Sequence, residues 1–214
     1  MFTFYTRRFE VKMKGYLSLR TQAPSRKGTV LLSYITAPFL VASTEDAFQR
    51  HTNYWECIDI ASIFLEEGYD VDVVDWNQYQ FTPKKPYRMV IDIHGSLPRF
   101  APFLPPECIK VFHITGAHWL YMNTAEYKRL IALQQRRGIT LFPRRQVPPS
   151  LNIETADCGT SLGNAFTFNT YAFSGKTIHP IPISTTHTFD FPETKDFSQA
   201  RKKFLWFGGG GLVH

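Results

Sequence analysis

The chain has 214 residues, of which 43% are hydrophobic and 20% charged, a balance typical of one large globular domain or of one domain and part of another. The net charge is +6, but the basic residues are scattered in small groups, so nucleic acid is not the expected partner. The three cysteines are widely spaced and form no CxxC or Cys/His cluster, so neither a disulfide framework nor a structural zinc site is indicated.

The sequence has no run of about 18 apolar residues, which excludes a membrane-spanning helix. Its beginning lacks the long apolar stretch and small-residue cleavage site of a signal peptide. We therefore expect a cytoplasmic protein with reduced cysteines. The mild positive charge leaves open a peripheral association with the inner face of the membrane.

The first predicted elements follow a strand–helix–strand order. Residues 1–28 alternate only weakly between apolar and polar side chains, and we interpret them as an N-terminal extension with at most one strand. The continuous apolar run at 29–35 is typical of a strand buried on both faces of a parallel sheet. A helix is predicted from Asn53, which forms a capping-box pattern with Glu56, and the next strand is predicted at 69–75.

The pattern continues along the chain. A second long helix is predicted to be capped by Asn123 and closed by Gly138, followed by an irregular, proline-containing stretch and a short helix or turn at 164–172. Further strands are predicted at 87–93, 108–115, 156–162 and 177–183. These elements predict an α/β fold: a Rossmann-like parallel sheet at 29–188 with helices on both faces.

The last part of the chain is predicted to contain a linker and the first strand and loop of a second domain. Residues 189–202 have no apolar periodicity and are expected to be a linker. Residues 203–214, KFLWFGGGGLVH, are typical of a strand followed by a glycine loop. A GxGxxG fingerprint fails at its last position in either register, but Gly208, Gly209, Gly210 and Gly211 suit a nest of backbone amides for a diphosphate. The alternative is a flexible tail.

The strongest candidates for a site in the body of the chain follow two predicted strands. In open α/β sheets, ligands bind beyond the carboxyl ends of the strands. Glycine there lets a ligand approach the backbone, and histidine can act as a general base or hydrogen-bond donor. The alternative is that these histidines are satisfied structural residues. The candidates are His94, Gly95, Ser96, Thr115, Gly116 and His118.

Other polar residues carry weaker indications. His113 lies inside a predicted strand and is expected to pack, and Asp92 is expected to pair with a neighbouring loop. Asp75 follows a strand end where Rossmann folds place a ribose-binding carboxylate, but no glycine follows the first strand, so a dinucleotide site is not expected. Arg144 and Arg145 suit either an anion clamp or a solvated loop. No metal-binding or P-loop motif is present.

The order of these parts resembles the N-terminal domain of a GT-B glycosyltransferase of the retaining, family-4-like kind. The resemblance covers roughly residues 29–214 and is carried by HTNYWECIDIASIFLEEGYDVDVVDW, RMVIDIHG, VFHITGAHW, ADCGTSLGNAFTFNTY and the terminal FLWFGGGGLVH. It implies two facing Rossmann-like domains, of which the first binds the acceptor and the second a nucleotide-sugar, normally without a metal or other cofactor. The chain departs from the pattern at Trp119, where the family often has Asp, and it ends before most of the second domain.

The resemblance also assigns roles to the candidate residues. His118 would take the catalytic, acceptor-side position, and the glycines 208–211 would face the donor diphosphate. The acceptor, a sugar or a lipid-linked molecule, would be bound by His94, Gly95, Ser96, Thr115 and Gly116. Because donor neutralisation and acceptor alignment are both needed for transfer, we expect this chain alone to be inactive.

Two other classes of function stay open. The first is a Rossmann-like binding or structural module without a reaction of its own. The second, less favoured because the first loop lacks glycine, is a nucleotide-dependent oxidoreductase or epimerase domain. The sequence does not identify the donor, the acceptor or the stereochemical course.

Overall fold

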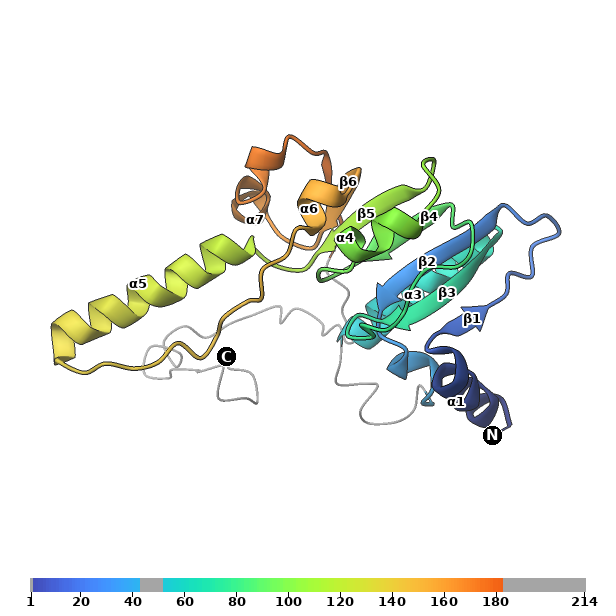
Figure 1. Cartoon of the computed structure of the whole chain (residues 1–214), viewed down its shortest axis with the longest axis horizontal. Helices are drawn as coiled ribbons and strands as arrows, with labels where there is room; N and C mark the ends of the chain where they lie inside the picture. Colours follow the sequence, from blue (N-terminus) through green and yellow to red (C-terminus); the bar gives the residue numbers. More distant parts are fainter. Residues whose placement is uncertain (1, 43–51, 183–214) are drawn as a thin grey trace, which may run out of the picture.

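The computed structural model describes residues 2–42 and 52–182, so the predicted linker, the glycine loop and Gly208–Gly211 lie outside the described residues. The described chain forms an α/β fold around one seven-stranded sheet with the order β1-β3-β2-β4-β5-β6-β7 (Figure 1). All neighbouring strands are parallel except β1, which pairs antiparallel with β3. The strands are β1 (Leu17–Leu19), β2 (Gly28–Tyr34), β3 (Tyr69–Asp75), β4 (Met89–Asp92), β5 (Ile109–Ile114), β6 (Cys158–Ser161) and β7 (Ile178–Pro180).

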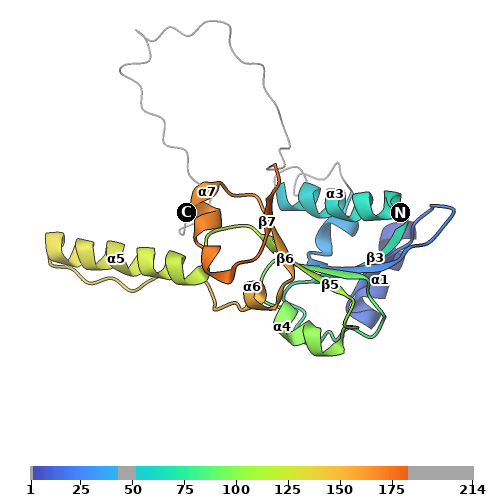
Figure 2. The same ribbon diagram turned by 90° about the horizontal axis from the view of Figure 1, so that it is seen from above.

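Helices cover both faces of this sheet, as predicted. Figure 2 shows α3 on one face and α4 and α6 on the other. The α-helices are α1 (Phe2–Lys14), α3 (Thr52–Glu66), α4 (Leu97–Phe100), α5 (Trp119–Arg137), α6 (Asn152–Thr155) and α7 (Ala165–Asn169). Three 3₁₀ turns complete the described elements: η1 (Ala37–Phe39), η2 (Ala101–Phe103) and η3 (Ala172–Ser174).

The sheet separates two apolar cores, which explains the continuous apolar run of β2. Because side chains alternate along a strand, Leu32 faces the α3 side and Leu31 the opposite side, and both are fully buried. The strand order also produces a topological switch point, since the chain moves from β2 to β3 and then returns past β2 to β4. The carboxyl ends of β2 and β4 therefore border a crevice, where open α/β sheets bind ligands.

Residues 1–28, which we interpreted as an extension with at most one strand, contain that strand, β1, and also the unpredicted helix α1. Two buried carboxyls of β3 hold this part of the chain. Asp72 accepts from Ser18 Oγ at 2.7 Å, and Asp70 accepts from Arg20 at 2.7 Å. Burial alone would raise the pKa of Asp70, but the hydrogen bonds from Arg20 and Thr21, together with the charges of Arg20 and Arg26, outweigh burial and the pKa is lowered.

The predicted start of the second long helix is wrong. The helix α5 begins at Trp119 and its N-cap is His118, five residues before Asn123, the predicted cap. Asn123 lies inside the helix and exchanges two hydrogen bonds with the backbone of Val147, at 3.0 and 2.8 Å. These bonds tie the irregular segment after α5 back to the helix. The predicted end at Gly138 is confirmed, since Gly138 adopts a left-handed φ of 65°.

Candidate functional site

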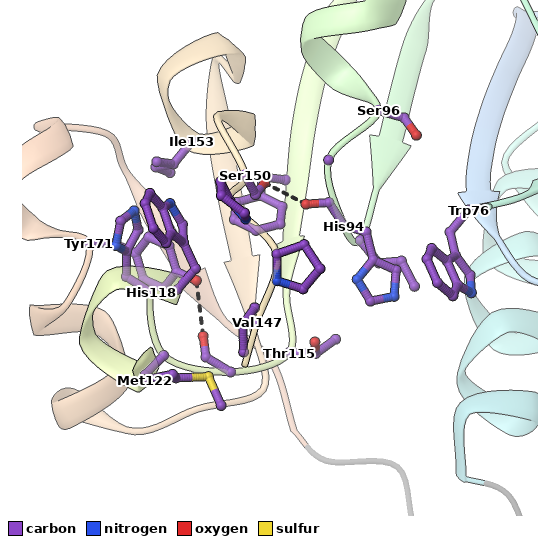
Figure 3. Close-up of a pocket in the computed structure, with 18 of the residues that line it drawn as sticks. Trp76, His94, Ser96, Thr115, His118, Met122, Val147, Ser150, Ile153 and Tyr171 are labelled. Atoms are coloured by element: carbon purple, nitrogen blue, oxygen red, sulfur yellow. Dashed lines mark hydrogen bonds between the residues drawn. The ribbon is translucent and has the colours of Figure 1, made fainter. Parts of the chain in front are cut away.

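A cavity of about 480 Å³ opens at the carboxyl ends of β4 and β5, in the size range of small-molecule sites. Its walls come from the loops that follow β3, β4 and β5 and from the segment between α5 and α6 (Figure 3). The six candidate residues from the two predicted strand ends all line it: His94, Gly95, Ser96, Thr115, Gly116 and His118. The rule that ligands bind beyond the carboxyl ends of strands, called here the strand-end rule, therefore selected residues that the structure brings together around one cavity.

A buried carboxyl fixes the turn that follows β4. Asp92 is fully buried and accepts from the backbone N–H of Ser96 at 2.8 Å and of His94 at 3.3 Å. The Asn152 amide donates to the same carboxyl at 2.6 Å, and the Ser33 hydroxyl also hydrogen-bonds to it. Asp92 thus connects β2, β4 and α6 and holds the 94–97 turn in place. The expectation that Asp92 pairs with a neighbouring loop is confirmed.

His94 lies at the mouth of the cavity, beside an aromatic ring. Its side chain packs against Trp76 with 4.3 Å between ring centroids, and Ser150 Oγ donates to its carbonyl oxygen at 2.5 Å (Figure 3). Although the residue keeps exposed surface, the surrounding protein excludes enough water to lower its pKa, against the opposing charge of Asp92. His94 is therefore neutral at neutral pH. Its ring nitrogens make no hydrogen bond within the described chain, so they are available to a ligand.

His118 is held differently from His94. It is 5% exposed, and its ring is enclosed by Tyr171, Phe173 and Trp119. Its Nδ1 accepts from the N–H of Leu120 at 3.4 Å, which caps α5. Burial lowers the pKa of His118, so the ring is neutral, and the cap assigns its single proton to Nε2.

This tautomer limits the chemistry of His118. Its Nε2 is buried without a hydrogen-bond partner in the described structure and carries a hydrogen to donate rather than a lone pair. The catalytic role that the resemblance implies for His118 stays a prediction. The geometry shown here makes it a cap that positions α5 and the cavity wall.

Neither cavity glycine is required by local strain. A Cβ on Gly95 would meet Ser150 at 3.6 Å and a Cβ on Gly116 would meet Met122 at 3.8 Å, which are ordinary contacts. Neither glycine has a left-handed φ. The absence of a side chain at these two positions therefore leaves open space in the cavity, consistent with the expected approach of a ligand to the backbone.

The sequence did not identify the aromatic character of this cavity. Trp76, Tyr79, Trp119 and Tyr171 all contribute to its lining. Trp76 directly follows β3, so the strand-end rule could have found it, whereas Tyr171 comes from a distant segment and packs edge-on against Phe112. The lining contains Arg99 and Arg145 as charged side chains but, among the described residues, no Asp or Glu.

A second, smaller cavity of about 210 Å³ lies on the α3 side and shares His94 and Thr115 with the first. Two of its lining residues, Tyr34 and Glu56, belong to a chain of buried polar side chains. Tyr34 donates to Glu56 at 2.5 Å, Glu56 pairs with His113 Nε2 at 3.2 Å, and His113 Nδ1 contacts Thr160 Oγ1 at 2.8 Å. The expectation that His113 packs is confirmed, since it is 1% exposed. Glu56, predicted to be part of a capping box, faces the interior instead.

The charge state of Glu56 follows from its partners. Burial alone would raise its pKa, but the hydrogen bonds from His113 and Tyr34 outweigh burial and the pKa is lowered. Burial and the neighbouring Glu56 charge raise the pKa of Tyr34. The network therefore holds an ionised carboxylate and a protonated phenol beside the second cavity at neutral pH.

Asp75 is already used inside the protein. One of its carboxylate oxygens accepts from the N–H of Thr36 at 3.0 Å and the other accepts from the Thr36 hydroxyl at 2.5 Å. These bonds fix the turn after β2. Since both oxygens are engaged, the position gives no support to a ribose-binding role.

Comparison of the chain with family models, with curated proteins and with solved structures gave no significant match. Within residues 2–42 and 52–182, no helix is long and apolar enough to cross a membrane. The same residues contain no group of three or more His, Cys, Asp or Glu side chains arranged to hold a metal ion.

Proposed function

We propose that the larger cavity binds a saccharide, as the acceptor of a glycosyltransferase of GT-B architecture. The observation that carries this proposal is the combination of aromatic walls with neutral hydrogen-bonding groups at the carboxyl edge of a parallel sheet. A sugar ring presents apolar C–H groups, which pack against aromatic rings, and hydroxyls, which need uncharged donors and acceptors. Trp76 provides an aromatic ring and the neighbouring His94 provides an uncharged hydrogen-bonding side chain.

The electrostatics of the cavity also favour a neutral or weakly anionic ligand. No carboxylate lines its described part, and both histidines have lowered pKa values. Arg145 offers a charge for a phosphate or carboxylate substituent. A cationic ligand would find no counter-charge in this lining.

In a transfer reaction, His94 suits the acceptor-side role better than His118. A general base needs an accessible lone pair within hydrogen-bonding reach of the acceptor hydroxyl. His94 lies at the cavity mouth with its ring nitrogens free within the described chain, whereas His118 uses Nδ1 as a helix cap. We therefore assign His94 to the acceptor hydroxyl and keep the donor-diphosphate role of Gly208–Gly211 as a prediction.

The alternative is saccharide binding without chemistry. It is favoured by the absence of an acidic side chain from the described lining of the larger cavity. Both versions predict saccharide binding, and only the transferase version predicts that replacing His94 with Ala abolishes turnover once a nucleotide-sugar and a complementary donor domain are supplied. Transfer catalysed by the 214-residue chain alone would contradict our expectation that it is inactive.

Saccharide binding is testable by tryptophan fluorescence, because two of the four tryptophans line the cavity. We expect a panel of neutral oligosaccharides to contain at least one that changes the emission in a saturable way. Trp76→Ala should weaken its binding at least about tenfold, which corresponds to about 1.4 kcal/mol. Phe103→Ala is the matched control, since Phe103 is an exposed aromatic outside the cavity and should bind as the unmodified protein does. Equal affinities for the two variants would contradict the assignment.

A further inference from the structure

The helix α5 and the segment after it form an arm that projects from the domain. Figures 1 and 2 both show α5 extending away from the sheet, with the following irregular segment running back beside it. No residue of α5 is buried, and its 19 residues give the arm a length of about 28 Å. Two hydrogen bonds hold the segment after α5 against the helix. The Val147 N–H donates to the Asn123 side chain, and the Gln146 amide donates to the Tyr127 hydroxyl at 2.5 Å. We call residues 119–147 the arm.

The arm contains nearly all of the protein's excess positive charge. It includes six of the 24 basic residues but only one of the 18 acidic residues, whereas the whole chain has a net charge of +6. The acidic residue, Glu126, is paired with Arg129 at 2.6 Å. The basic residues are Lys128, Arg129, Arg136, Arg137, Arg144 and Arg145.

The same arm exposes large apolar side chains. Leu120, Tyr127 and Ile131 are each about half exposed, and their spacing of seven and four residues places them on one face of α5. At the far end, Leu141 is 53% exposed and Phe142 is 88% exposed. Moving an apolar side chain as exposed as Phe142 out of water lowers the free energy.

These two features together indicate the occupant of the surface. The phosphates of a nucleic acid would neutralise the Lys and Arg side chains but would leave Leu120, Ile131 and Leu141 exposed to water. An anionic lipid surface satisfies both, because its headgroups attract Lys and Arg while aliphatic and Phe side chains enter the boundary of the acyl region. We propose that the arm docks on a membrane that contains anionic phospholipid, with Phe142 and Leu141 inserted at its tip.

This inference does not depend on the ligand of the cavity. The arm and the cavity are nevertheless adjacent. Four residues belong both to the base of the arm and to the cavity lining: Trp119, Met122, Arg145 and Val147. Docking along the length of α5, through the face that carries Leu120, Tyr127 and Ile131, would therefore hold the cavity entrance beside the bilayer. A lipid-linked molecule could then reach the cavity without leaving the membrane.

The test uses the full chain and vesicles of phosphatidylcholine with or without phosphatidylserine, separated by flotation. We expect binding to the vesicles that contain phosphatidylserine and a loss of binding at high salt. The double variants Leu141→Ser with Phe142→Ser, and Arg136→Glu with Arg137→Glu, should each reduce binding at least about tenfold. All four side chains are exposed, so these variants should keep the fold.

Two variants outside the arm serve as matched controls. Ile63→Ser removes a side chain that is 57% exposed on α3, and Lys84→Glu reverses an exposed charge. Both should float with the vesicles as the unmodified protein does. The proposal is overturned if the protein binds no vesicles, if it binds neutral and anionic vesicles equally, or if the arm variants bind like the controls. Self-association through the arm, seen by light scattering as a dimer that the Phe142 variant abolishes, would also overturn it.

Discussion

Asp92→Ala is expected to lower the free energy of unfolding by at least about 3 kcal/mol, because it leaves several buried donors without an acceptor. The lost partners are the Ser33 hydroxyl, the Asn152 amide and the Ser96 N–H. The same change frees the 94–97 turn and should therefore also reduce saccharide binding. Urea denaturation followed by circular dichroism measures the first effect.

The matched control for this variant is Asp59→Ala, which removes an exposed carboxylate on α3. A surface change of this kind should alter the free energy of unfolding by no more than about 0.5 kcal/mol. If Asp92→Ala and Asp59→Ala unfold at the same urea concentration, the network does not hold the turn in the way described.

Glu56→Ala is expected to cost about 3 kcal/mol at neutral pH, since it strands the buried Tyr34 hydroxyl and His113 Nε2. The cost should depend on pH. The pKa of Glu56 is lowered in the folded protein below its ordinary value of 4.5. Its stabilising contribution is therefore fully present above about pH 4.5 and is lost as the pH falls through the folded-state pKa.

The measurement compares the unfolding of the unmodified protein and of Glu56→Ala at pH 7 and at pH 4. The difference between the two proteins should be largest at pH 7 and should shrink at pH 4. A difference that stays constant, or grows on acidification, would show that the Glu56 carboxylate is not stabilised in its charged form. Asp59→Ala again provides a reference without a buried partner.

The sheet could be predicted from the sequence because its strands are buried on both faces. The continuous apolar runs that became β2 and β3 admit few other structures, and the structure places both within one residue of the prediction. The helix α1 could not be found in this way. Its position depends on distant contacts, such as those that Arg7 and Arg8 make with the carbonyl oxygens of Phe39 and Leu40.

Two local motifs were misleading because tertiary contacts outweighed them. Asn123 followed by Glu126 matches a helix start, but both residues lie within α5 and Glu126 pairs with Arg129. The actual cap is His118, a residue type that is uncommon at this position. Glu56 likewise matched a capping box, but its carboxylate forms the buried pair with His113.

The candidate site was predictable as far as strand ends define it. His94 and Thr115 were found because the chain places them within two residues of the ends of β4 and β5. Arg145 and Tyr171 come from segments whose approach to the sheet depends on how α5 and α7 pack, and no local pattern contains that information. The division of roles between the two histidines also required geometry, since it depends on which nitrogen caps α5.

The most direct test of saccharide binding is an NMR titration of the isotope-labelled chain with the oligosaccharide that changes the tryptophan emission. We predict that the shift changes concentrate on the amides of Gly95, Ser96 and Gly116 and on the indole N–H groups of Trp76 and Trp119. Residues of the edge strand β1, none of which lines the cavity, should be unaffected. Shift changes that concentrate away from the cavity, or a panel in which no oligosaccharide produces any, would contradict the proposed function.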